Sequence, residues 1–141
     1  MRAVLDTNTV VSALLWEGPA SRLLAAARDQ HMELLTSATL LDELLDVLPR
    51  RKFSRKIQAA DLTVTQLVHR YALLARQVIP ASITARIAAD PDDDAVLACA
   101  LAAQADLIVS GDGHLLTLKH SHGIQIVTAV EALQRVAEQS A

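Results

Sequence analysis

The sequence predicts one α/β domain spanning residues 1–141, with helices on both faces of a short-stranded, mainly parallel sheet. Its 141 residues fit a single domain with a core of ordinary size. Hydrophobic residues make up 52% of the chain but aromatic residues only 2%, so the core must be built from Leu, Val, Ile and Ala. Short apolar runs without polar alternation are separated by helical patterns, which is typical of parallel sheets buried on both faces.

Four short apolar runs are the predicted strands. Each of them ends at a polar or charged residue, and none alternates between apolar and polar positions, so we expect both faces of each strand to be buried. The runs are residues 2–5, 32–36, 107–110 and 124–127.

Five further segments show helical patterns. The first opens with Pro19, which suits the first helical position, and the second stops before Pro49. In the last, Thr128 and Glu131 have the spacing of a capping box. The segments are residues 19–30, 37–48, 61–77, 92–105 and 129–139.

Composition excludes several classes of protein. No run approaches the roughly 18 apolar residues of a membrane span, and "MRAVLDTN" reaches an acidic residue too early for a signal peptide, so we expect a cytoplasmic protein without membrane contact. Cys99, the only cysteine, allows neither an internal disulfide nor a cysteine zinc cluster, and its apolar neighbours indicate an unreactive thiol. With a net charge of -3, any contact with nucleic acid must be local.

Carboxylates gather in "DPDDDAVLACA", residues 90–100, where four Asp residues occupy the first five positions. Such a run indicates either a solvated helix start, where Asp is favoured, or a site for a divalent cation that neutralises the repulsion. Asp6 follows the first predicted strand and Asp112 follows "LIVSG". In a parallel sheet both would lie at the carboxyl edge, where ligands bind, although Asp6 taken alone is equally well explained as a helix cap.

A leucine stripe runs along the predicted helix 37–48 and indicates its buried face. Asp42 and Asp46 fall outside this stripe and are expected to be solvated, whereas Glu43 lies at its margin, where a side chain can reach into a cleft. The stripe consists of Leu40, Leu41, Leu44, Leu45 and Leu48.

Taken in order, "VLDTN", "LLDELLDVL", "DDDAVLACALAAQADLIVSGD" and the terminal strand resemble the PIN-domain nucleases. The resemblance covers nearly the whole chain and is closest to the small bacterial PIN proteins that act as toxins of toxin-antitoxin pairs. It implies a three-layer α/β/α fold, hydrolysis of RNA by acids that hold Mg²⁺ or Mn²⁺, and a small antitoxin protein as partner.

The resemblance also assigns site residues by position. Asn8 and Ser110 match polar positions that line the site, and Asp93 is the alternative to Asp94 because some relatives place that acid one residue earlier. We prefer Asp94, which keeps the family's spacing to Asp112. The catalytic, metal-binding acids implied in this way are Asp6, Glu43, Asp94 and Asp112.

The chemistry of phosphodiester hydrolysis agrees with this assignment. The reaction needs a hydroxide near neutral pH and neutralisation of charge on the phosphoryl oxygens, and a divalent ion supplies both. Carboxylate oxygens favour Mg²⁺ or Mn²⁺. The sequence offers no competing nucleophile, because Ser110 has no identifiable His and Asp partners and no glycine-rich phosphate loop is present.

"PRRKFSRK", residues 49–56, is the one strongly basic stretch. It would attract RNA phosphates while Phe53 stacks on a base, or it is a solvated connector with a buried Phe53. Its cations, the candidate RNA-binding residues, are Arg50, Arg51, Lys52, Arg55 and Lys56. A second stripe, which is most simply core, could also contribute a surface for an antitoxin or for a second subunit of a homodimer; it comprises Leu67, Val68, Tyr71, Leu74 and Ala75.

Two other functions compete with the nuclease. "DTNTV" resembles the start of the aspartate-nucleophile phosphatases, but Asn8 stands where their general acid would be. The other alternative is a catalytically silent PIN-like module that binds RNA or an antitoxin without cutting. Keeping four acids together without a metal would cost such a module stability through charge repulsion.

Overall fold

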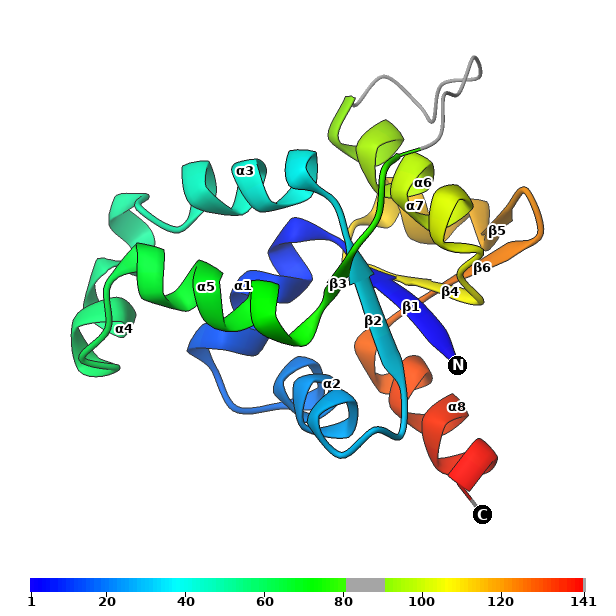
Figure 1. The fold of residues 1–141 in the computed structure, drawn as a ribbon, viewed down its shortest axis with the longest axis horizontal. Coiled ribbons are helices and arrows are strands. Elements are labelled where there is room, and N and C mark those ends of the chain that lie inside the picture. Colours follow the sequence, from blue (N-terminus) through cyan, green and yellow to red (C-terminus); the bar gives the residue numbers. More distant parts are fainter. Residues whose placement is uncertain (81–90, 141) are drawn as a thin grey trace.

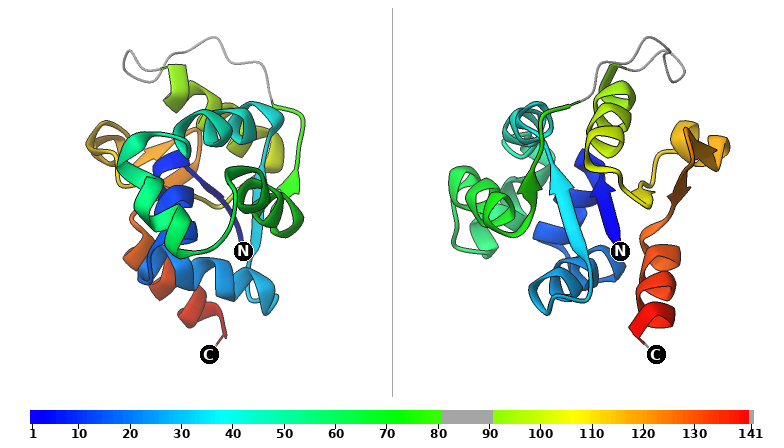
Figure 2. Two further views of the ribbon diagram at one scale, coloured as in Figure 1. Left: turned by 90° about the vertical axis from the view of Figure 1, so that its left-hand side faces the viewer. Right: turned by 45° about the vertical axis from the view of Figure 1, so that its right-hand side comes forward.

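The computed structural model describes residues 1–80 and 91–140, apart from the side chains of residues 91–93 and 140. Asp90 and the side chains of Asp92 and Asp93 therefore lie outside the described residues. Helices cover both faces of a central sheet, so the predicted three-layer α/β/α fold is confirmed (Figures 1 and 2). None of the helices in the described part is both long enough and apolar enough to cross a membrane.

The sheet has six strands in the order β3-β2-β1-β4-β6-β5, and every neighbouring pair is parallel except β5 with β6. All four predicted strands are present, and the second and third are one residue shorter than predicted because they begin at Glu33 and end at Val109. The strands are β1 (Arg2–Leu5), β2 (Glu33–Thr36), β3 (Arg76–Gln77), β4 (Leu107–Val109), β5 (His120–Ser121) and β6 (Ile124–Val127).

The predicted helices are present, with ends that differ by no more than three residues from those predicted. The capping box of the last helix is confirmed, because the backbone N–H of Thr128 donates to Glu131 and that of Glu131 donates to the Thr128 hydroxyl. These helices are α2 (Pro19–Arg28), α3 (Ala38–Val47), α5 (Val64–Leu74), α6 (Pro91–Ala103) and α8 (Ala129–Ser140).

The prediction of a helix over residues 61–77 is wrong at both ends. Thr63 caps α5 in a box with Gln66, with N···O distances of 2.8 and 3.1 Å, so the helix cannot begin earlier. At the other end, Ala75 is extended and the chain enters β3, where Arg76 pairs with Leu35 of β2. Two-residue strands such as β3 and β5 are too short to leave a pattern in a sequence.

Four helical segments were not among the predicted helices. The segment α1 begins directly after Asp6, and η1 and α4 form the basic stretch that follows α3. The segments are α1 (Thr7–Leu15), η1 (Arg51–Phe53), α4 (Ser54–Ala59) and α7 (Gly113–Leu118).

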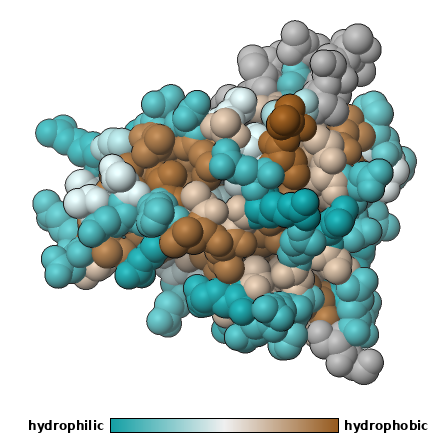
Figure 3. All heavy atoms as spheres, in the orientation of Figure 1, coloured by the Kyte–Doolittle hydropathy of each residue, from teal (hydrophilic) through white to brown (hydrophobic). Residues whose placement is uncertain are grey.

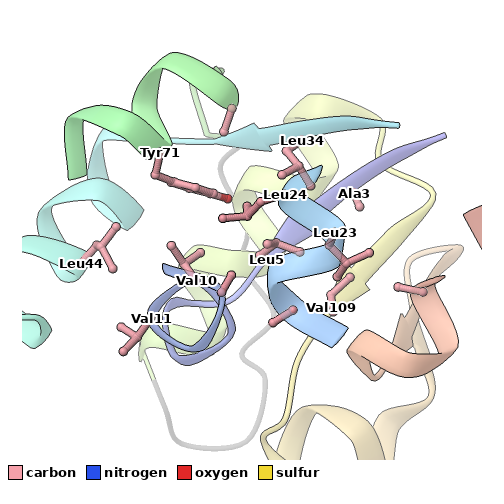
Figure 4. Close-up of a cluster of buried hydrophobic side chains, with 14 of the residues drawn as sticks. Ala3, Leu5, Val10, Val11, Leu23, Leu24, Leu34, Leu44, Tyr71 and Val109 are labelled. Carbon is pink, nitrogen blue, oxygen red and sulfur yellow. The ribbon is translucent and has the colours of Figure 1, made fainter. Parts of the chain in front are cut away.

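Alternate residues of the strands face two separate cores. Ala3 and Leu5 of β1 pack with α1, α2, α5 and α8, and part of this core is shown in Figure 4. Val4 points to the opposite core, which is covered by α6 and α7. The aliphatic composition of the chain suits a sheet with a core on each face, because branched aliphatic side chains pack well on both faces of short strands.

The leucine stripe of α3 is predicted correctly except at one position. Leu40, Leu44 and Leu48 are buried and Leu41 is half-buried, but Leu45 is 40% exposed. Helix α3 contacts α1, α5 and α6, and this contact surface is narrower than the predicted stripe. Asp42 and Asp46 are exposed, as predicted.

The strand order places a switch point beside β1. From β1 the chain proceeds to β2 on one side of the sheet, whereas β4 lies against β1 on the other side. In open α/β sheets the crevice at such a point, beyond the carboxyl ends of the strands, is the usual ligand site. Asp6 leaves β1 and Ser110 leaves β4 at this point.

Candidate active site at the carboxyl edge of the sheet

Asp6 lies directly beyond β1 and is buried, with 7% of its surface exposed. Its backbone N–H donates to the carbonyl of Val109 at 3.0 Å, which extends the pairing of β1 with β4. Its Oδ1 accepts from the backbone N–H of Thr9 at 2.9 Å, so Asp6 is the N-cap of α1. The interpretation of Asp6 as a helix cap is therefore confirmed, and capping uses one of its two carboxylate oxygens.

Ser110 connects two of the predicted acids. Its hydroxyl, 1% exposed, donates to Oδ2 of Asp6 at 2.5 Å and accepts from the backbone N–H of Asp112 at 2.9 Å. Ser110 is thus the residue that positions the end of β1 against the end of β4.

Asp112 is the N-cap of the short helix α7. Its Oδ1 accepts from the backbone N–H of His114 at 2.8 Å, and its other oxygen makes no hydrogen bond with the part of the chain that the structure describes. The side chain is half-buried at the wall of an open cleft of about 650 Å³. Asn8 and Ser110 line the same cleft, between α1, α2 and the start of α8.

Asp94 and Glu43 lie on the helices α6 and α3. Asp94 is 6% exposed in the first part of α6, a helix that contacts β1, β2, β4 and α3. Glu43 is half-buried on α3, which contacts α1 and α6. A carboxylate as buried as that of Asp94 must be compensated by hydrogen bonds, by an opposite charge or by a cation if it is to stay ionised.

The side chains of the candidate site are of the type that binds a hard divalent cation, because carboxylate and hydroxyl oxygens are the ligands that Mg²⁺ and Mn²⁺ prefer. Among the side chains of residues 1–80 and 94–139, however, no group of three or more His, Cys, Asp or Glu is arranged to hold a metal ion. Helix capping and the Ser110 hydroxyl engage both oxygens of Asp6 and one oxygen of Asp112.

A set of buried polar groups near Asp6 was not identified from the sequence. The Tyr71 hydroxyl and the Thr7 hydroxyl are buried without a hydrogen-bond partner among the described residues. Burial raises the pKa of Tyr71 above its ordinary value, and the charges of Cys99 and Asp6 raise it further. Tyr71 occupies a core position of α5 (Figure 4), so helical periodicity predicts its burial and not what surrounds its hydroxyl.

Cys99 is the unreactive thiol that the sequence predicts. It is fully buried on α6, and this burial raises its pKa to about 12 against the opposing effect of a hydrogen bond with Ser37. Thiolate is the reactive form of cysteine, so Cys99 is not a nucleophile in the folded protein.

The basic stretch lies at the far end of α3 from the strand ends (Figure 1). Phe53 is buried and meets Trp16 edge to face at 6.1 Å between ring centroids, so the hypothesis that Phe53 stacks on a base is wrong. Lys56 lies 5.4 Å from the ring centroid of Trp16, which is 40% exposed. All five predicted cations, Arg50, Arg51, Lys52, Arg55 and Lys56, are exposed.

Comparison with known proteins adds one finding. The model of a protein family described as the PIN domain matches residues 2–114, which include the four candidate site acids. No curated protein matches the chain.

Proposed function

The chain belongs to the PIN-domain family, whose members are generally nucleases, and we propose that it is a Mg²⁺- or Mn²⁺-dependent endoribonuclease. One observation carries this proposal: the Ser110 hydroxyl joins Asp6 to the backbone of Asp112 at the switch point of the sheet. Family members typically use divalent metal ions, and the donor chemistry at this edge suits such an ion.

Asp6, Glu43, Asp94 and Asp112 would hold the ion, with Asp93 as the alternative to Asp94. When bound, the ion supplies a hydroxide and neutralises charge on the phosphate. Ser110 keeps the carboxylate of Asp6 in place through its 2.5 Å hydrogen bond. Asn8 is exposed on the first turn of α1 and lines the cleft beside Asp112, where its amide can donate to a phosphate oxygen.

The exposed cations of residues 50–56 are proposed to contact RNA through its phosphates, without base stacking on Phe53. Contacts of this kind are electrostatic and weaken as salt rises. Neutralising Arg51 and Arg55 to Gln is expected to reduce RNA binding at low salt more than at high salt.

The toxin role is proposed from the resemblance to toxin-like PIN proteins, with a small antitoxin protein covering the acidic cleft. Expression in a bacterial host tests this: the wild type alone should arrest growth, whereas Asp6→Asn should not. Normal growth with the wild-type protein, at the same level of expression, would contradict the toxin role.

A homodimer is the second proposed association. Hydrophobic side chains gather over α3 and α5 on one face of the molecule (Figure 3), where Leu45 is 40% exposed and Leu73 is 75% exposed. Apolar surface of this kind favours association. Sedimentation of the wild type beside Leu73→Lys tests whether this face joins two copies.

A binding module that does not cleave RNA is the alternative, and one observation favours it. No three acids among the described residues are arranged around a single metal position. The decisive experiment is cleavage of a single-stranded RNA with Mg²⁺, with Mn²⁺ and with EDTA. Cleavage that depends on the metal supports the nuclease, whereas RNA binding without cleavage in all three conditions supports the module. Phosphate trapped covalently on Asp6 would instead support the phosphatase.

A further inference from the structure

We propose that a second cleft, lined by β6 and by parts of β5, α7 and α8, binds the phosphate backbone of the RNA substrate. This inference rests on the proposed function. The cleft has a volume of about 630 Å³, and three basic side chains line it, those of Lys119, His120 and Arg135. It is separate from the basic stretch of residues 50–56, which belongs to η1 and α4.

The basic cleft adjoins the candidate active site. Thr128 lines both this cleft and the one that contains Asn8 and Asp112. Asp112 caps the start of α7 and Lys119 caps its end, and a helix of that length spans roughly 9 Å. An RNA strand with its scissile phosphate at Asp112 can therefore continue past Thr128 toward Lys119.

Two of the basic groups are available for a ligand. The Lys119 ammonium and the His120 ring make no hydrogen bond or ion pair with the described residues, and both side chains are exposed. The backbone around them is held in place, because the carbonyl of Lys119 accepts from the N–H of Ile126 at 2.8 Å. Both groups can therefore turn toward a phosphate without breaking a contact of the fold.

Glu131, the acid that lines this cleft, keeps its negative charge and is held at the start of α8, so the lining carries one carboxylate beside the cations of Lys119 and Arg135. Glu131 accepts from the backbone N–H of Thr128 at 3.1 Å and from its hydroxyl at 3.0 Å, and these bonds lower its pKa. The guanidinium of Arg135 donates to the side-chain oxygen of Gln125. Because a guanidinium has five N–H donors, Arg135 retains donors for a phosphate.

Charge favours RNA over a protein ligand here. The net charge of the whole chain is -3, so a local concentration of cations is what a polyanion requires in order to bind. A cleft with acids at one end and basic side chains at the other also suits the substrate of a nuclease. The scissile phosphate would lie at the acids and their metal ion, and the neighbouring phosphates of the RNA would lie at the basic side chains.

The test compares Lys119→Gln, the double variant Lys119→Gln/Arg135→Gln and the control Arg28→Gln. Arg28 is exposed at the end of α2, and the chain then enters the amino end of β2, which lies at the opposite edge of the sheet from Asp6 and Asp112. RNA binding is measured by fluorescence anisotropy in EDTA over a range of salt concentrations, with melting curves to confirm folding. The plot of the logarithm of the RNA-binding constant against the logarithm of the salt concentration has a negative slope. Its magnitude should decrease by about 0.7 for each cation that no longer binds a phosphate of single-stranded RNA, and it should stay unchanged in Arg28→Gln.

Cleavage with Mg²⁺ separates this inference from the proposed function. A dinucleotide has a single phosphodiester, the one that is cleaved, and therefore no second phosphate for the basic cleft. The double variant should cleave it like the wild type, whereas its KM for a longer oligonucleotide should rise with kcat retained. If the wild type cleaves RNA and a folded Lys119→Gln variant has the same salt slope and the same KM, the proposed role of the basic cleft is overturned and the proposed nuclease is not. If the variants have reduced salt slopes but the wild type does not cleave RNA, the proposed nuclease activity is overturned and the cleft remains an RNA-binding site.

Discussion

The Ser110 hydroxyl donates a 2.5 Å hydrogen bond to Oδ2 of Asp6, although the two residues are 104 positions apart in the chain. The same hydroxyl accepts from the backbone N–H of Asp112 at 2.9 Å. One buried side chain thus joins the residue that follows β1 to the loop that follows β4, and it holds the Asp6 carboxylate in place.

Replacing Ser110 with Ala should lower the free energy of unfolding by about 1 to 3 kcal/mol, because it leaves a buried oxygen of Asp6 without its donor. Urea unfolding monitored by circular dichroism measures the change. Ser12→Ala is the matched control, since Ser12 is exposed on α1 and its loss should change stability little. Equal unfolding midpoints for the two variants would contradict this role of Ser110.

Asp94→Asn should reduce metal-dependent RNA cleavage ~100-fold or more, as expected when electrostatic support for the reacting phosphate is lost. The fold should persist, because Asn has nearly the size of Asp and the change removes a buried charge. Initial rates on a single-stranded RNA measure the effect.

Asp92→Asn and Asp93→Asn complete this series with the same chemical change at neighbouring positions. Asp92→Asn should remain active. A loss of activity in Asp93→Asn alone would move the ligand by one residue, and full activity in all three variants would reduce the acidic run to a helix start.

Mg²⁺ or Mn²⁺ should raise the melting temperature, and EDTA should reverse the rise, since a ligand that binds only the folded state stabilises it by mass action. Asp6→Asn should no longer respond to the metal, and without metal it should melt below the wild type, because a side-chain amide has one acceptor oxygen and cannot accept from both the N–H of Thr9 and the Ser110 hydroxyl. A melting temperature that is indifferent to millimolar metal in the wild type would count against a preformed site.

The stability of the protein should decrease in alkaline solution because of Cys99. Burial raises the pKa of the folded thiol from an ordinary 9.0 to about 12, so the unfolded chain loses this proton first as the pH rises. The free energy of unfolding therefore falls between pH 9.0 and about 12. The raised pKa of Tyr71 acts in the same direction at higher pH.

Urea unfolding at neutral and at alkaline pH checks this dependence. The decrease should be smaller in Cys99→Ala, which has no thiol to titrate. A thiol reagent should modify the wild type only as it unfolds, and rapid modification of the folded protein at neutral pH would refute the assignment.

Much of the fold follows from local patterns in the sequence. The bounds of β1 and β6 are those predicted, and the capping box of Thr128 and Glu131 begins α8 as predicted. These features depend on residues close together in the chain, where apolar periodicity and capping chemistry act directly. The order of strands and helices was also enough to predict that Asp6 and Asp112 leave the same edge of the sheet.

The tertiary structure decided the features that join distant residues. The Ser110 to Asp6 hydrogen bond, the exposure of Leu45 and the burial of Phe53 against Trp16 all depend on which elements pack together. The same holds for the two clefts that share Thr128, one lined by Lys119 and Arg135 and the other by Asp112. Periodicity reports only which side of a segment is buried, whereas strand register and helix packing determine which side chains meet, because these depend on the whole chain at once.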